Sequence, residues 1–299
     1  HLATSLRLYS IIVCSVTVMF ASVAKGNDVM PEVEGISISF ITVLLALFSA
    51  GVGIWFIKTS RYILPRQGYL DPAITPTMAI LLIIAMVVLG VLGSLWGISQ
   101  VPDGQIETLE SVGKVMGPAL LAQIPVLLAY AMLRKRCGSR HILPVSVTGF
   151  LVFVPLAITI ATLFHEFFSK IGLEPSTILG HKTLLMLSQS QFDRSAWIVI
   201  ICSTVGAGIT EEVLYRGLLL PTFAAVFKGK TAWGAIVATS VVFALVHSEV
   251  ATYSAMAGLF ILSLGLCWAR VKSGGVLAPI AIHVLFNAMN IAIVYSTNL

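Results

Sequence analysis

The stretch Gly208-Ile-Thr-Glu-Glu-Val-Leu-Tyr-Arg-Gly217 places three charged side chains inside an apolar segment. Each charge at the centre of a bilayer costs roughly 2.5–3.5 kcal/mol on insertion scales, so these groups need partners or a polar cavity. On a helix, Glu212 and Arg216 lie one turn apart on one face and can form an ion pair. Glu211 points about 100° away and lacks this partner. The spacing predicts a structural carboxylate at Glu212 and an available one at Glu211, unless Glu211 only caps a helix broken at Gly206.

Two later apolar segments each contain a histidine. His247 ends the run Phe243-Ala-Leu-Val-His247, and His283 shares a helical face with Asn287, four residues on. A carboxylate and an imidazole can together take a proton from water, while a second imidazole and an amide can donate hydrogen bonds to an oxyanion. A lone histidine in such a segment is usually a packing residue. The set of Glu211, His247, His283 and Asn287 instead predicts the catalytic residues of a peptidase.

Two other chemistries compete with this interpretation. Glu211, His247 and His283 form a two-histidine, one-carboxylate set of the kind that binds zinc, although the chain lacks an HExxH motif. A serine nucleophile at Ser248 is disfavoured because no GxSxG motif accompanies it. The sequence has no P-loop or GxGxxG motif, and its four cysteines have no ligand-like spacing. We therefore expect no required cofactor, with zinc at those three residues as the alternative.

The composition indicates what kind of scaffold positions these residues. The 299-residue chain is 58% hydrophobic and 10% charged, whereas soluble domains are about 25% charged. This excludes a disordered chain, a disulfide scaffold and a cytosolic enzyme, and it predicts an all-α polytopic transmembrane bundle. About eight spanning helices are expected after an uncertain first run, which also fits a signal peptide. The apolar runs are 8–24, 35–57, 77–100, 116–133, 141–164, 195–218, 231–247, 252–269 and 275–297.

The lysines and arginines predict the orientation of the bundle. If all nine runs span, twelve of these residues fall in one set of connections and five in the other. The positive-inside rule then places the connections 101–115 and 165–194 outside, and it explains the net charge of +5 without a nucleic-acid partner. The long connection 165–194 is either a lid or a connector, and its histidines His165 and His181 are expected to be solvated. With these boundaries, His247 and His283 lie too far apart along the membrane normal to meet.

Three motifs in order carry a resemblance to a known family: Glu-Glu-x-x-x-Arg at 211–216, Phe-x-x-x-His at 243–247 and His-x-x-x-Asn at 283–287. Together they resemble the CPBP (CAAX protease and bacteriocin-processing, Rce1-like) family of intramembrane endopeptidases, over about residues 195–297. The resemblance implies that Glu211 is a general base assisted by His247, that His283 and Asn287 form an oxyanion hole, and that Glu212 and Arg216 support the site structurally. It also implies a glutamate-based mechanism without a catalytic metal.

The predicted organisation has three parts. Residues 1–34 form a signal-like or first transmembrane segment, residues 35–194 form additional helices and the external loop, and residues 195–299 form the catalytic bundle. The predicted function is hydrolysis of a peptide bond in a membrane-bound or lipid-modified polypeptide, with membrane lipid as the other partner. The expected location is a bacterial inner membrane. A non-catalytic scaffold or bacteriocin-immunity protein of the same fold is the alternative, and a proton-coupled transporter is disfavoured because no inverted repeat is present.

Overall fold

A computed structural model describes residues 36–64, 74–102, 108–134, 141–174, 181–227 and 232–297. In these ranges the regular structure is helical, apart from one isolated antiparallel bridge between His181 and Ala251. The predicted all-α class is thereby confirmed. The first apolar run, 8–24, and the predicted segment 1–34 lie outside the described residues.

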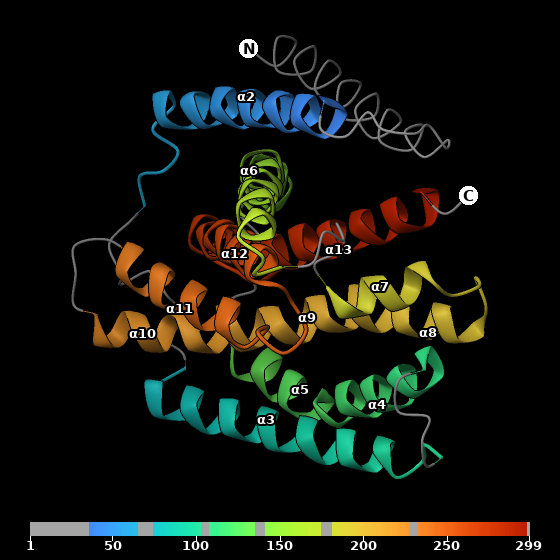
Figure 1. Ribbon diagram of the computed structural model, residues 1–299. Coiled ribbons are helices and arrows are strands. Elements are labelled where there is room, and N and C mark those ends of the chain that lie inside the picture. The colour runs from blue at the N-terminus through green and yellow to red at the C-terminus, as the bar shows by residue number, and fades with distance from the viewer. Residues whose placement is uncertain are drawn as a thin grey trace.

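The helices follow one another along the chain and carry the labels of Figure 1. Their bounds are α2 (Ile36–Lys58), α3 (Pro76–Ile98), α4 (Leu109–Ala122), α5 (Ile124–Leu133), α6 (Ile142–Lys170), α7 (Lys182–Ser188), α8 (Arg194–Ile201), η3 (Cys202–Gly206), α9 (Ala207–Glu211), η4 (Glu212–Leu219), α10 (Leu220–Val226), α11 (Trp233–Leu245), α12 (Tyr253–Ser273) and α13 (Leu277–Thr297).

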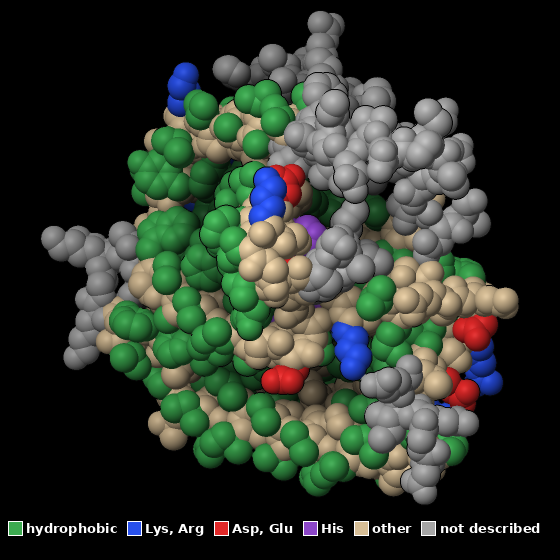
Figure 2. All heavy atoms as spheres, in the orientation of Figure 1, with side chains coloured by type: hydrophobic (Ala, Val, Ile, Leu, Met, Phe, Trp, Pro, Cys, Tyr) green, Lys and Arg blue, Asp and Glu red, His purple; other side chains and the backbone are tan. Residues whose placement is uncertain are grey.

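Six described segments are long and apolar enough to cross a membrane: Pro76–Ile98, Leu109–Leu133, Ile142–Lys170, Arg194–Val226, Tyr253–Ser273 and Leu277–Ser296. They make this an integral, multi-pass membrane protein, and Figure 2 shows hydrophobic side chains over most of the described surface in view. The predicted run 231–247 is wrong in length, because α11 has 13 residues. Such a helix is about 20 Å long, shorter than the roughly 30 Å hydrocarbon core.

Helix ends that the charge distribution predicts on one side of the membrane lie together in the structure. Arg61 follows α2, His141 precedes α6 and Lys272 lies in the last turn of α12, and all three line one cavity. At the opposite end, the backbone N–H of Lys182 donates to the carbonyl of Val250 at 2.9 Å. The cationic ends of α2, α6 and α12 therefore lie together, and the connection before α8 meets the turn between α11 and α12.

The segment Arg194–Val226 is the central element of the site. It runs from α8 to α10 as one helix and lies between the α3–α5 layer and the layer of α12 and α13 (Figure 1). Two stretches, η3 and η4, are π-helical, with the wider turns that i→i+5 hydrogen bonds produce and that are frequent at functional sites. Gly208, between them, lets α13 approach closely, since a Cβ there would lie 2.7 Å from Val284 Cγ2. This contact brings α13, and with it His283, against the helix that carries both glutamates.

Candidate active site

The buried ion pair predicted from spacing is present in η4. Arg216 Nη1 donates to Glu212 Oε1 at 2.8 Å, and both side chains are fully buried. Arg216 Nη2 also donates to Ser263 Oγ of α12 at 2.7 Å, and the guanidinium lies 4.5 Å from the centre of the Phe243 ring. Because the charges neutralise each other and retain hydrogen bonds, they can be buried in an apolar bundle.

His283 connects this ion pair to the second glutamate. Its Nδ1 lies 2.7 Å from Glu212 Oε1. A carboxylate bound to Arg216 accepts hydrogen bonds, so Nδ1 of His283 carries the proton and donates. The other ring nitrogen, Nε2, lies 4.0 Å from Glu211 Oε2. Glu212 therefore fixes the orientation of the His283 ring and the position of its proton.

His247 approaches Glu211 from the end of α11. Its Nδ1 lies 2.7 Å from the carbonyl oxygen of Phe243, which can only accept, so Nδ1 is the donor here as well. The Nε2 atom lies 3.9 Å from Glu211 Oε2. Because α11 ends at Leu245 within the bundle, His247 reaches the same carboxylate as His283. The predicted separation of the two histidines is wrong for this reason.

The two histidines and Glu211 thus surround one point. Glu211 Oε2 is buried and has no hydrogen-bond partner among the described residues, although the side chain as a whole is 27% exposed. A water oxygen about 2.8 Å from Glu211 Oε2 and from each Nε2 atom would fit between them, because two contacts of about 2.8 Å that meet at about 90° span about 4 Å. This arrangement can hold a water and accept a proton from it.

The remaining predicted residue, Asn287, lies one turn beyond His283 and contacts the other π-helical stretch. Its Nδ2 donates to the carbonyl oxygen of Ser203 in η3 at 2.8 Å. This bond uses one of the two amide hydrogens and leaves the second for another acceptor. The structure therefore places Asn287 beside η3, tied to the backbone, and not in direct contact with Glu211.

The candidate zinc ligands do not fit a tetrahedral zinc site as they are placed. Ligands about 2.1 Å from a zinc ion are separated by about 3.4 Å in tetrahedral geometry, whereas Glu211 Oε2 lies 3.9 and 4.0 Å from the two Nε2 atoms. Among the described residues, no group of three or more His, Cys, Asp or Glu side chains has a geometry that could hold a metal. We therefore assign no step to a metal.

Residues of the connection 165–194 pack against the turn that follows His247, and the sequence patterns did not indicate them. The Glu174 carboxylate accepts from the backbone N–H of Ser254, at 2.7 Å, and lies 3.2 Å from His165 Nδ1. His181 is largely buried close to His247, and both effects lower its pKa from 6.5 to about 4. His165 and His181 are thus partly buried and not fully solvated as expected, because the connection packs against the turn after His247.

Comparison with known proteins gives a family match and a bacterial relative. Residues 193–289 match the model of a family described as "Type II CAAX prenyl endopeptidase Rce1-like". A protein of Escherichia coli named "Uncharacterized 24.3 kDa protein" is 36% identical over 81 residues, which are 26% of this chain and 35% of that relative. The match thus spans about a third of the relative's length. No solved structure matches the chain significantly.

Proposed function

We propose that the protein is a glutamate-dependent intramembrane endopeptidase, because residues 193–289 match the model of the Rce1-like family of CAAX prenyl endopeptidases. Its proposed substrate is a membrane-associated or lipid-anchored polypeptide. The observation that carries the proposal is the approach of two imidazole Nε2 atoms to the unpartnered Glu211 oxygen, at 3.9 and 4.0 Å. The proposed location is a bacterial inner membrane.

In the proposed reaction, Glu211 and His247 activate the water. The water oxygen attacks the carbonyl carbon of the scissile bond, and its proton passes to the Glu211–His247 pair. The carbonyl oxygen becomes an oxyanion. When the intermediate collapses, the carbon–nitrogen bond breaks, and the stored proton is transferred to the leaving nitrogen. The direct products are a carboxylic acid and an amine, and the acid then loses its proton to the amine as a carboxylate and an ammonium form, so atoms and charge balance.

His283 and Asn287 are the proposed donors to the oxyanion. His283 already donates from Nδ1 to Glu212, so it donates from Nε2 only when the ring carries two protons. Asn287 would use the amide hydrogen that is not bound to Ser203. Removing one such donor typically slows a hydrolase by about 100- to 1000-fold. In this scheme Glu212 and Arg216 are positioning residues, since they act through His283.

The test compares new protein termini in membranes from cells that produce the wild-type chain, Glu211→Gln or Glu110→Gln at equal levels. Glu110 is a matched control because it is an exposed glutamate that pairs with Lys114 on α4. We expect termini that are present with the wild type and Glu110→Gln and absent with Glu211→Gln. Identical termini in all three samples would refute the peptidase and favour the alternative of a non-catalytic scaffold or immunity protein.

A further inference from the structure

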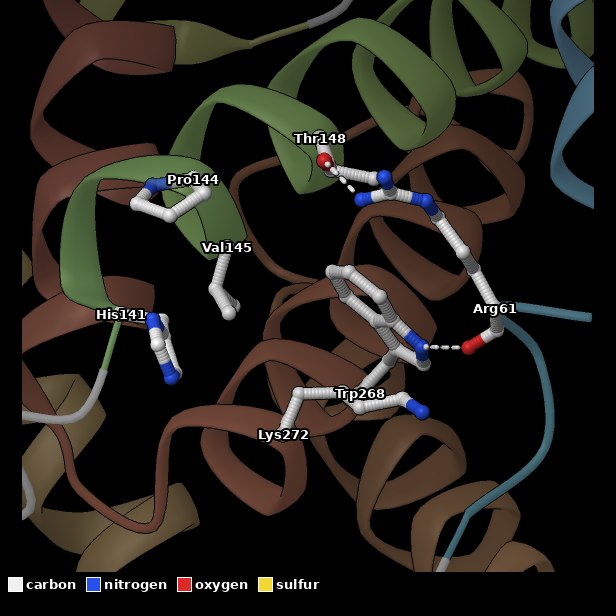
Figure 3. Close-up of a pocket in the computed structure, with 7 residues that line it drawn as sticks. All are labelled: Arg61, His141, Pro144, Val145, Thr148, Trp268 and Lys272. Carbon is white, nitrogen blue, oxygen red and sulfur yellow. Dashed lines mark hydrogen bonds between the residues drawn. The ribbon is translucent and has the colours of Figure 1, made fainter. Parts of the chain in front are cut away.

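A cavity of about 250 Å³ lies at the end of the bundle that carries Arg61 and Lys272. It is formed where α2 ends, α6 begins and α12 ends, and it shares no lining residue with the site at Glu211. Figure 3 shows its side chains around one space, with His141 and Val145 on one side and Arg61, Trp268 and Lys272 on the other. The cavity thus joins three helix ends that are distant in sequence.

The ionisable side chains that line this cavity are Arg61, Lys272 and His141, and no carboxylate lines it. Arg61 Nη1 donates to Thr148 Oγ1 at 3.2 Å, and Lys272 Nζ donates to the carbonyl oxygen of Ile63 at 2.5 Å. A guanidinium has five N–H donors and an ammonium has three, so most of them stay available. Within the described ranges, the ion pairs include neither Arg61 nor Lys272. The cavity therefore presents positive charge and hydrogen-bond donors without a bound carboxylate.

Several contacts hold the wall that carries these donors. Trp268 is 2% exposed, and its Nε1 donates to the backbone carbonyl of Arg61 at 3.0 Å. The indole packs on Phe56 and Phe153 with ring centres 5.5 and 5.8 Å away. The Arg61 guanidinium also lies 5.0 Å from the Trp55 ring centre. A cation held in place before the ligand arrives loses less entropy on binding.

The side of the cavity formed by the start of α6 adds partial positive charge. The long helix α6 begins at Ile142, and the side chain of its N-cap residue, His141, makes no capping hydrogen bond. The N-terminal end of a helix carries a partial positive charge and free backbone N–H groups, which favour an anion. The cavity is smaller than the roughly 300–1,000 Å³ of drug-sized ligand pockets. Its size and charge suit a small anionic group.

From these features we infer that the cavity between α2, α6 and α12 binds a phosphate group through Arg61, Lys272 and His141. The phosphate is either the headgroup of an anionic phospholipid or a free phosphate anion. The positive-inside rule places this end at the cytoplasmic face, where basic pockets between spanning helices bind anionic headgroups. The inference does not depend on the proposed peptidase activity.

The test is native mass spectrometry of the purified full-length protein, titrated with phosphatidylglycerol or phosphatidylcholine. Lys272→Gln and Arg61→Gln each remove one cation of the cavity, and Lys272→Arg retains it. Lys58→Gln is the matched control, since Lys58 is exposed at the same end, on α2, and does not line the cavity. Elution as a single species and thermal unfolding in phosphatidylcholine establish that each variant is folded. If Lys272→Gln does not fold, Arg61→Gln decides the test.

We expect the wild-type protein to prefer phosphatidylglycerol, and Lys272→Gln or Arg61→Gln to weaken its binding about tenfold, as for the loss of one charge-assisted hydrogen bond. Lys58→Gln and Lys272→Arg should change it by less than about twofold. Competition by millimolar inorganic phosphate, with a rise in unfolding temperature, identifies free phosphate as a ligand. Binding of lipid without such competition identifies the headgroup. Equal binding of both lipids without a phosphate effect, or equal weakening by Lys58→Gln and Lys272→Gln, overturns the inference.

Discussion

Replacing Glu211 by glutamine and replacing Glu212 by glutamine should affect different properties of the protein. Glu211 Oε2 has no hydrogen-bond partner among the described residues, so Glu211→Gln breaks no described bond of that oxygen. Glu212 is fully buried and accepts from both Arg216 and His283. One substitution should therefore remove catalysis, and the other should remove stability.

The expected magnitudes follow from these contacts. Breaking a buried ion pair costs about 3–5 kcal/mol because it leaves the other charge unpaired. Arg216 keeps its bond to Ser263 Oγ in Glu212→Gln, which favours the lower end of that range. A loss of about 3 kcal/mol lowers the unfolding temperature by roughly 5–10 °C in a protein of this size. For Glu211→Gln we expect a change within about 2 °C, with peptide hydrolysis slowed at least about 100-fold.

The assay combines two measurements on the same preparations. Thermal unfolding is followed by intrinsic fluorescence in detergent, and peptidase activity is measured as new termini per folded protein in reconstituted membranes. Glu110→Gln serves as the control in both. The assignment of roles is refuted if Glu211→Gln retains activity, or if it lowers the unfolding temperature more than Glu212→Gln does.

Further predictions concern the surroundings of the site. Asn287→Ala should lower kcat for peptide hydrolysis about 100-fold or more, with a smaller change in KM. The free energy of unfolding should fall by about 1 kcal/mol because the hydrogen bond to Ser203 is lost. A change in KM alone contradicts this prediction. Gly208→Ala should destabilise the protein by about 1–3 kcal/mol because the new Cβ meets Val284. The control Gly117→Ala should not, because a Cβ at Gly117 has no neighbouring atom within 4 Å. Equal unfolding temperatures of these two variants would exclude the packing role of Gly208. Millimolar EDTA should leave hydrolysis unchanged, and restoration of lost activity by added zinc would overturn the metal-free mechanism. His181 has a pKa lowered to about 4 in the folded protein, so unfolding curves should show stability that is complete above about pH 6.5 and decreases towards pH 4; His181→Gln should reduce this pH dependence.

Residue spacing predicted the features of the site that depend on one helix. The four-residue interval from Glu212 to Arg216 is enough to anticipate their ion pair, because i and i+4 side chains remain neighbours in this helix. The same spacing predicted that Glu211 does not pair with Arg216. Hydrophobic runs likewise predicted a multi-pass helical protein, since length and apolarity are properties of each segment alone.

Features that depend on packing between segments were not predictable in this way. The end of α11 at Leu245 decides whether His247 can reach Glu211, yet the apolar run continues through Val246. The burial of His181 depends on its pairing with Ala251, and that of Glu174 on the first turn of α12. The last two contacts join residues that are 70 and 80 positions apart, for which one sequence has no periodic signal.

Glu212 explains why charged residues can persist in this apolar bundle and still serve chemistry. A carboxylate that paired only with Arg216 would satisfy the burial requirement and have no connection to the water site. Because the same Oε1 atom lies 2.8 Å from Arg216 Nη1 and 2.7 Å from His283 Nδ1, the ion pair also orients the imidazole that faces Glu211. The cost of burying Glu212 and Arg216 is thus offset within η4. Glu211, at the adjacent position, keeps an Oε2 atom that has no hydrogen-bond partner in the described part of the chain and can accept a proton.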